Sequence, residues 1–74
     1  MIVHVELNGQ LLPGSLRKQD LELPADASVR EAAMFLKLKV EEIGLVTING
    51  IQSEMEDKLP LGSRLCFFPY LSGG

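Results

Sequence analysis

Tryptophan is absent from the 74-residue sequence, and cysteine, histidine and tyrosine each occur once. The single cysteine, Cys66, cannot form an internal disulfide, so the cytoplasm is the expected location. Because Cys66 lies in an apolar segment with no histidine or asparagine near it in sequence, we interpret it as a small hydrophobic residue. The single histidine, His4, predicts neither a histidine-based metal site nor a catalytic triad. We therefore expect no metal and no catalytic group of the chain's own.

The sequence also lacks an excess of basic residues and a long apolar run. Seven lysines and arginines against ten acidic residues give a formal net charge of -3, which argues against binding to a phosphate backbone. Residues 1–5 contain no basic run that leads into a long apolar segment, so neither a signal peptide nor a membrane span is predicted. We expect neither a nucleic acid nor a membrane as partner.

What is present is the composition of a small folded domain. Hydrophobic residues make up 46% of the chain and charged residues 23%, which is typical of a globule rather than a disordered segment. At this length, folding buries only about 60–65% of the surface of the unfolded chain, which leaves no room for a deep catalytic cleft. We expect a single domain over residues 1–74.

The first part of the chain has the pattern of two strands. Residues 2–7 alternate apolar and polar side chains, which predicts a strand with one wetter face. Asn-Gly and Pro-Gly turn signals then predict a loop over residues 8–15. The second strand is expected at about residues 16–23, with Leu21 and Leu23 facing inward.

Ser28 and Glu31 have the spacing of a capping box, in which each side chain accepts from the backbone N–H of the other residue. A helix is therefore predicted to start here. The stripe expected to lie on the sheet consists of Val29, Ala32, Ala33, Leu36 and Val40. The residues expected on the opposite side are Met34, Phe35 and Leu38, covered either by the 8–15 loop or by a partner or second copy.

The remaining chain predicts two more strands. Residues 45–48 form a continuous apolar run, as expected for a strand inside a sheet, and a tight turn at Asn49-Gly50 follows. Residues 51–59 carry an acidic cluster and are expected to be a solvated loop. In the last strand, at 64–68, the alternating pairs are Leu65 and Phe67 on one face and Cys66 and Phe68 on the other.

The resulting order is strand, strand, helix, strand, strand. A right-handed crossover places the last strand beside the first. The prediction is therefore an α+β fold of the β-grasp type, in which a mixed, curled sheet of about four strands covers a single helix.

The last residues of the chain differ from an ordinary strand end. After Phe68 comes Pro69, which cannot donate to a sheet ladder, and the sequence finishes with Gly73-Gly74. Two glycines can thread a narrow channel and leave the terminal carboxylate sterically open. The alternative is an ordinary frayed chain end. We favour a functional tail over residues 70–74.

Three segments of the second half resemble the ubiquitin-like bacterial sulfur carriers: residues 44–50 (GLVTING), 61–63 (LGS) and 67–74 (FFPYLSGG). These carriers include the small subunit of molybdopterin synthase (MoaD-like) and the thiamine-pathway carrier (ThiS-like). The helix opening at Ser28 fits the family too, although only the last ten residues are specific. Phe-Phe-Pro before the diglycine is closer to the molybdopterin branch. Ser63 and Tyr70 depart from the family, which usually has an aspartate and a small residue or proline there.

The resemblance implies a carrier and not an enzyme. A partner, an adenylating E1-like activating enzyme, would use ATP to adenylate Gly74, and a sulfur donor would displace AMP to leave a thiocarboxylate. A synthase large subunit, or an equivalent acceptor enzyme, would take the sulfur. No cofactor would be bound permanently. The tail is expected to comprise Tyr70, Leu71, Ser72, Gly73 and Gly74, and the partner-binding residues are expected to be Phe68 and Pro69.

Three alternatives remain open from the sequence. The first is a thiamine-pathway sulfur carrier, which uses the same chemistry. The second is a ubiquitin-like modifier whose Gly74 is joined to lysines of other proteins. The third is an interaction module in which the tail has no chemical role.

Overall fold

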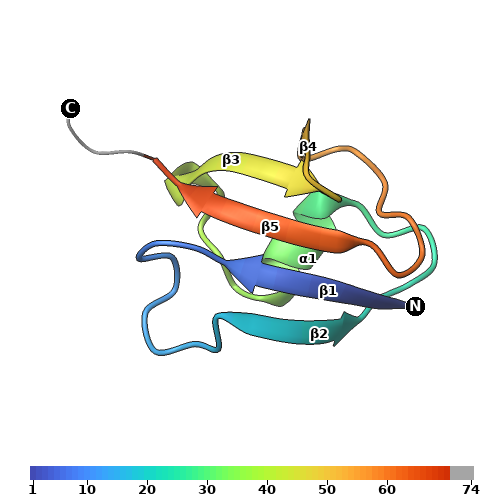
Figure 1. The fold of residues 1–74 in the computed structure, drawn as a ribbon, viewed down its shortest axis with the longest axis horizontal. Coiled ribbons are helices and arrows are strands. Elements are labelled where there is room, and N and C mark those ends of the chain that lie inside the picture. The colour runs from blue at the N-terminus through green and yellow to red at the C-terminus, as the bar shows by residue number, and fades with distance from the viewer. Residues whose placement is uncertain (71–74) are drawn as a thin grey trace.

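The computed structural model describes residues 1–70 and confirms the predicted β-grasp (Figure 1). The elements are β1 (Ile2–Leu7), β2 (Lys18–Glu22), α1 (Val29–Phe35), a 3-10 helix (Val40–Glu42), β3 (Ile43–Ile48), β4 (Ile51–Ser53) and β5 (Arg64–Pro69). The strands form one sheet in the order β2-β1-β5-β3-β4. β5 runs parallel to β1 and antiparallel to β3, so the last strand lies beside the first, as predicted.

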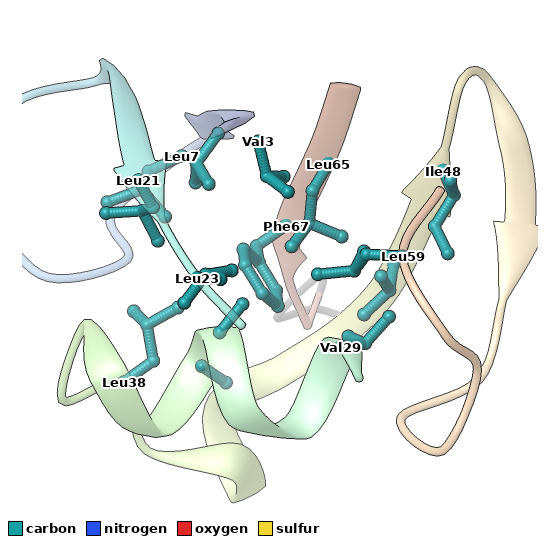
Figure 2. Close-up of a cluster of buried hydrophobic side chains, with 14 of the residues drawn as sticks. Val3, Leu7, Leu21, Leu23, Val29, Leu38, Ile48, Leu59, Leu65 and Phe67 are labelled. Atoms are coloured by element: carbon teal, nitrogen blue, oxygen red, sulfur yellow. The ribbon is translucent and has the colours of Figure 1, made fainter. Parts of the chain in front are cut away.

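The core lies between one face of the sheet and α1 (Figure 2). The inward residues of β1 are those that the alternation predicts, Val3, Val5 and Leu7, and all are buried. Phe67 is fully buried and points from β5 into the space between the sheet and the helix. Burial of an aromatic ring removes a large apolar area from water, so Phe67 stabilises the packing of the helix on the central strand.

The capping box is present as predicted. The Oγ atom of Ser28 accepts from the backbone N–H of Glu31 at 3.3 Å, and the Glu31 carboxylate accepts from the N–H of Ser28 at 3.1 Å. The two bonds satisfy N–H groups that the first helical turn cannot pair internally. The helix face against the sheet consists of Val29, Ala32 and Ala33, which have no exposed surface.

The prediction for Leu38 was wrong. Met34 and Phe35 are exposed as expected, but Leu38 is buried in the core. The helix ends at Phe35, and Lys37 takes a left-handed conformation with φ 63°. The N–H of Leu38 donates to the carbonyl of Ala33 at 2.9 Å, the bond of a Schellman motif that turns the chain back over the core. Helical spacing therefore does not apply beyond Phe35.

The sheet has five strands and not the predicted four, because β4 lies within the segment expected to be a loop. The tight turn at Asn49 (φ 52°) and Gly50 (φ 83°) is confirmed, and it joins β3 to β4 in a hairpin. β4 is an edge strand of only 3 residues, and its Ile51 is exposed, so it has no alternating burial pattern. β2 also starts later than predicted, at Lys18, and leaves Leu16 exposed.

None of the helices in residues 1–70 has the length and apolar character needed to span a bilayer.

Candidate functional site at the end of the last strand

The candidate site lies at the end of β5, the central strand, where the chain leaves the sheet. This point, at Pro69 and Tyr70, is called the exit below. β5 is bonded on one side to β1 and on the other to β3 (Figure 1). Its last residue, Pro69, pairs with Ile43 at the start of β3. Tyr70 follows and is largely exposed. The predicted tail residues Leu71, Ser72, Gly73 and Gly74 lie outside the described residues.

Phe67 and Phe68 face opposite sides of β5, as predicted from the alternation. Phe67 is buried in the core, whereas Phe68 is half-buried on the outer face of the sheet, paired in register with Leu45 of β3. Leu45 is itself partly exposed. The predicted partner-binding residue Phe68 therefore lies on an outward apolar surface.

This surface forms an open depression beside the end of β5. Its lining residues are Asn8, Gly9, Gly44, Leu45, Phe68, Pro69 and Tyr70. The structure thus brings together the predicted residues Phe68, Pro69 and Tyr70. The apolar side chains of the depression therefore lie next to the point where the chain leaves the sheet.

Gly44 brings the start of β3 against the backbone of the exit. A Cβ atom at this position would lie 2.8 Å from the Cα of Tyr70 and 2.9 Å from the carbonyl oxygen of Pro69. The ladder between β3 and β5 is irregular at this point, between Ile43 and Leu45, and a glycine at an irregular ladder position often marks a close approach of two backbones. Gly44 is a site residue that the sequence analysis did not identify as such.

Gly9 makes a similar approach from the opposite side. Its φ is 61°, and a Cβ atom on it would lie 2.6 Å from the Cγ of Pro69. The neighbouring Asn8 donates to the carbonyl oxygen of Phe67 through its backbone N–H at 3.1 Å and its side-chain amide at 3.2 Å. The Asn8-Gly9 turn signal located this loop, but it did not indicate that the loop contacts β5.

Among the residues that line the apolar depression, Tyr70 is the one titratable side chain. Two carboxyl groups, those of Glu41 and Glu42, line a second depression on another side of Pro69 and Tyr70. His4 forms a 2.7 Å hydrogen bond with Asp20 and lies opposite Arg64, at the other end of β5. Because a strand rises about 3.3 Å per residue, this is roughly 17 Å along the strand from Pro69.

Cys66 does not line the depression at the exit either. It is buried on the outer face between Glu6 of β1 and Thr47 of β3, and its Sγ atom is 4.0 Å from a Glu6 carboxylate oxygen. Within residues 1–70 no group of three or more histidine, cysteine or acidic side chains could hold a metal ion. What the described residues offer at the exit is an open apolar surface.

The order of the elements and the five-stranded mixed sheet define a β-grasp fold of the ubiquitin-like type. No protein-family model and no curated protein matches the sequence. Among solved structures, SAMP1 from Haloferax volcanii matches with a TM-score of 0.80 and 24% identity over 100% of both chains. The H. volcanii small archaeal modifier protein 1 structure matches with a TM-score of 0.77 and 22% identity, covering 95% of this chain and 98% of that chain.

A third structure connects the fold to the family that the C-terminal motif resembles. A Pyrococcus furiosus protein provisionally assigned as molybdopterin converting factor subunit 1 matches with a TM-score of 0.73 and 23% identity, covering 95% of this chain and 98% of that chain. At the level of fold, the resemblance to MoaD-like proteins is therefore confirmed.

Proposed function

We propose that this chain is a ubiquitin-like sulfur carrier and that its Gly74 carboxylate is the cargo site. The observation that carries the proposal is a central strand that ends beside an apolar depression and is followed in the sequence, after Tyr70, Leu71 and Ser72, by Gly73-Gly74. Residues 70–74 would act as the tail of a single domain. The catalytic groups would belong to partner enzymes.

The proposed cycle follows from the chemistry of a carboxylate. The anion is a poor electrophile, so an activating enzyme joins it to the α-phosphate of ATP and releases pyrophosphate. The resulting acyl adenylate has a good leaving group. Sulfide attacks the carbonyl carbon of Gly74 and forms the C–S bond, the C–O bond to AMP breaks, AMP departs, and the sulfur loses its proton to leave a C-terminal thiocarboxylate. Its sulfur is a nucleophile that an acceptor enzyme can direct at a cofactor precursor.

The finer proposal is that the chain is the small subunit of a molybdopterin synthase. Two observations support it: the Phe67-Phe68-Pro69 sequence before the tail, and the similarity to the P. furiosus structure. The partners would then be an E1-like activating enzyme and the synthase large subunit. A thiamine-pathway carrier is the alternative within the same chemistry.

A second candidate function is that of a protein modifier, and one specific observation favours it. One of the similar structures, from H. volcanii, is of a protein named small archaeal modifier protein 1. A modifier also needs an adenylated C-terminal glycine, but the glycine is then transferred to an amine of another protein. The two functions share the first step and differ in the atom that attacks the adenylate.

Phe68, Leu45 and Pro69 are proposed to form the contact surface for these partners. Phe68 and Leu45 are neighbours across the ladder and both reach solvent. An aromatic side chain enclosed by apolar partner surface is a common energetic centre of an interface. The surface adjoins the exit at Tyr70, so a partner bound there would hold the tail in its own active site.

The experiment that tests the shared first step measures pyrophosphate release when the chain is mixed with the activating enzyme of its own organism and ATP. The proposal expects release that depends on the chain and is lost when Gly73 and Gly74 are deleted. The matched control is Gly14→Ala, at a loop glycine that has nothing within 4 Å of an added Cβ. Thermal unfolding of the truncated chain should remain cooperative. Full activity of the truncated chain would overturn both the carrier and the modifier function.

A further inference from the structure

Arg17 makes an unusual set of hydrogen bonds to the loop between β1 and β2. Its guanidinium donates to the carbonyl oxygens of Gly9 at 3.0 Å, Leu11 at 2.6 Å and Leu12 at 2.8 Å. The Nε atom adds a longer bond to the carbonyl of Ser15 at 3.4 Å. The planar fork of a guanidinium can reach several acceptors at once, which a lysine ammonium on a flexible stem does less well.

The loop depends on these hydrogen bonds because it contains no helix or strand. Residues 8–17 separate the two strands, and Leu12 has a left-handed φ of 47°, which is unfavourable for a side chain of this kind. Leu11 anchors the loop in the core. The bonds from Arg17 to the carbonyls on both sides of this anchor fix the path of the loop backbone.

The loop is in turn pressed against the end of β5. Gly9 lies so close to the ring of Pro69 that a Cβ would overlap it, and Asn8 is bonded twice to the carbonyl of Phe67. On the other side, Gly44 packs on the backbone of Tyr70. Pro69 and Tyr70 are therefore held between two backbone segments, of which only one, β3, belongs to the sheet.

We propose that Arg17 is a positioning residue for the carboxyl-terminal segment: it fixes the 8–15 loop, and through Gly9 it fixes Pro69 and the direction in which the chain leaves the sheet at Tyr70. This inference rests on the proposed function. A carboxylate that must meet ATP in a partner's active site reacts fastest when its approach is already oriented, and a displacement of the order of 1 Å can slow a reaction about 100-fold. Phe68 and Leu45 would supply the binding, and Arg17 the orientation.

The test compares Arg17→Met and Arg17→Lys with the wild-type chain. Arg17→Met has no donor for the loop carbonyls, and Arg17→Lys keeps the charge but loses the fork. The matched control is Lys18→Met, which removes the same charge at the adjacent, exposed position. Three quantities are measured: the NMR cross-relaxation between the Gly9 Hα protons and the Pro69 ring protons, and the kcat and KM for adenylation by the activating enzyme.

For Arg17→Met we expect loss of the Gly9–Pro69 cross-relaxation and a fall in kcat of about tenfold or more. KM should change less than about twofold, because Phe68 and Leu45, which supply the binding, are not held by the loop. Arg17→Lys should lie between Arg17→Met and wild type, and it carries the test if Arg17→Met does not fold. Lys18→Met should behave as wild type. An Arg17 variant that loses the cross-relaxation but keeps the wild-type kcat overturns the inference, and so does a folded Arg17→Met chain that keeps the wild-type cross-relaxation. If the wild-type chain is not adenylated at all, it is the proposed function that fails.

Discussion

Gly44 lies directly against the backbone of Tyr70, and no other residue type fits at this contact without movement. An added Cβ would be 2.8 Å from the Cα of Tyr70 and 2.9 Å from its nitrogen. Both atoms belong to the main chain, so they cannot move away as the end of a flexible side chain could. The contact packs the start of β3 against the chain at the end of β5 and restricts the position of the Tyr70 backbone on that side.

Gly44→Ala is expected to displace the exit. The φ angle of Gly44 is not in the left-handed region, so the effect comes from the contact, and overpacking of this kind costs about 1–3 kcal/mol. We expect a lower free energy of unfolding together with slower adenylation. Gly50→Ala is the control: it is strained at φ 83° but has nothing within 4 Å, so it should lower stability and leave adenylation unchanged. Wild-type adenylation of Gly44→Ala would contradict a role for this contact at the exit.

Gly9→Ala and Pro69→Ala are expected to compensate each other. The added Cβ meets Pro69 Cγ at 2.6 Å and Cδ at 3.1 Å, but Pro69 Cβ only at 3.9 Å. Truncating Pro69 to alanine removes the two close atoms. The double variant should therefore be more stable than the sum of the single changes by about 0.5–3 kcal/mol, as measured in a denaturant double-mutant cycle.

The control for this cycle is Gly14, which has a φ of 87° and no atom within 4 Å of an added Cβ. Gly14→Ala should carry only the backbone strain, about 1–2 kcal/mol, and should show no coupling to Pro69→Ala. Additive effects of Gly9→Ala and Pro69→Ala would mean that the loop does not press on the exit.

Phe67→Ala should mainly lower the stability of the domain, whereas Phe68→Ala should mainly weaken binding to the activating enzyme, although the two residues are adjacent. Phe67 is fully buried, and its truncation is expected to cost about 3–5 kcal/mol, a large fraction of the stability of a small domain. Phe68 is half-buried on the outer face, so its loss should cost about 1 kcal/mol and mainly weaken the complex with the activating enzyme. Thermal unfolding and a titration of the complex separate the two. Unchanged affinity of Phe68→Ala would remove this residue from the contact surface.

The parts of the fold that the sequence predicts are those set by local chemistry. The alternation of β1, the capping box at Ser28 and the Asn49-Gly50 turn each depend on neighbouring residues, and all are present. Leu38 was misplaced because Lys37 occupies a left-handed position where glycine is usual, so the residue type did not mark the end of the helix.

The candidate site also contains residues that the sequence predicts and residues that it does not. Phe68, Pro69 and Tyr70 could be identified from the strand pattern and the motif, since they are consecutive in sequence. The contacts of Gly9 with Pro69 and of Gly44 with Tyr70 could not, because they join segments far apart in the chain. The bonds of Arg17 are local, to carbonyls 5 and 8 residues earlier, but no sequence pattern indicates them. A glycine that is needed for a close approach has the same sequence signal as one in an open turn. Only the distance to the other backbone distinguishes them.

The most direct test of the carrier function is the intact mass of the chain after incubation with its activating enzyme, ATP and sulfide. The account predicts a mass increase equal to the replacement of one oxygen by sulfur, located on Gly74 by fragmentation and absent when ATP is omitted. A chain that is adenylated but never acquires sulfur, and instead accumulates as isopeptide-linked species of higher mass, would contradict the carrier function and establish the modifier.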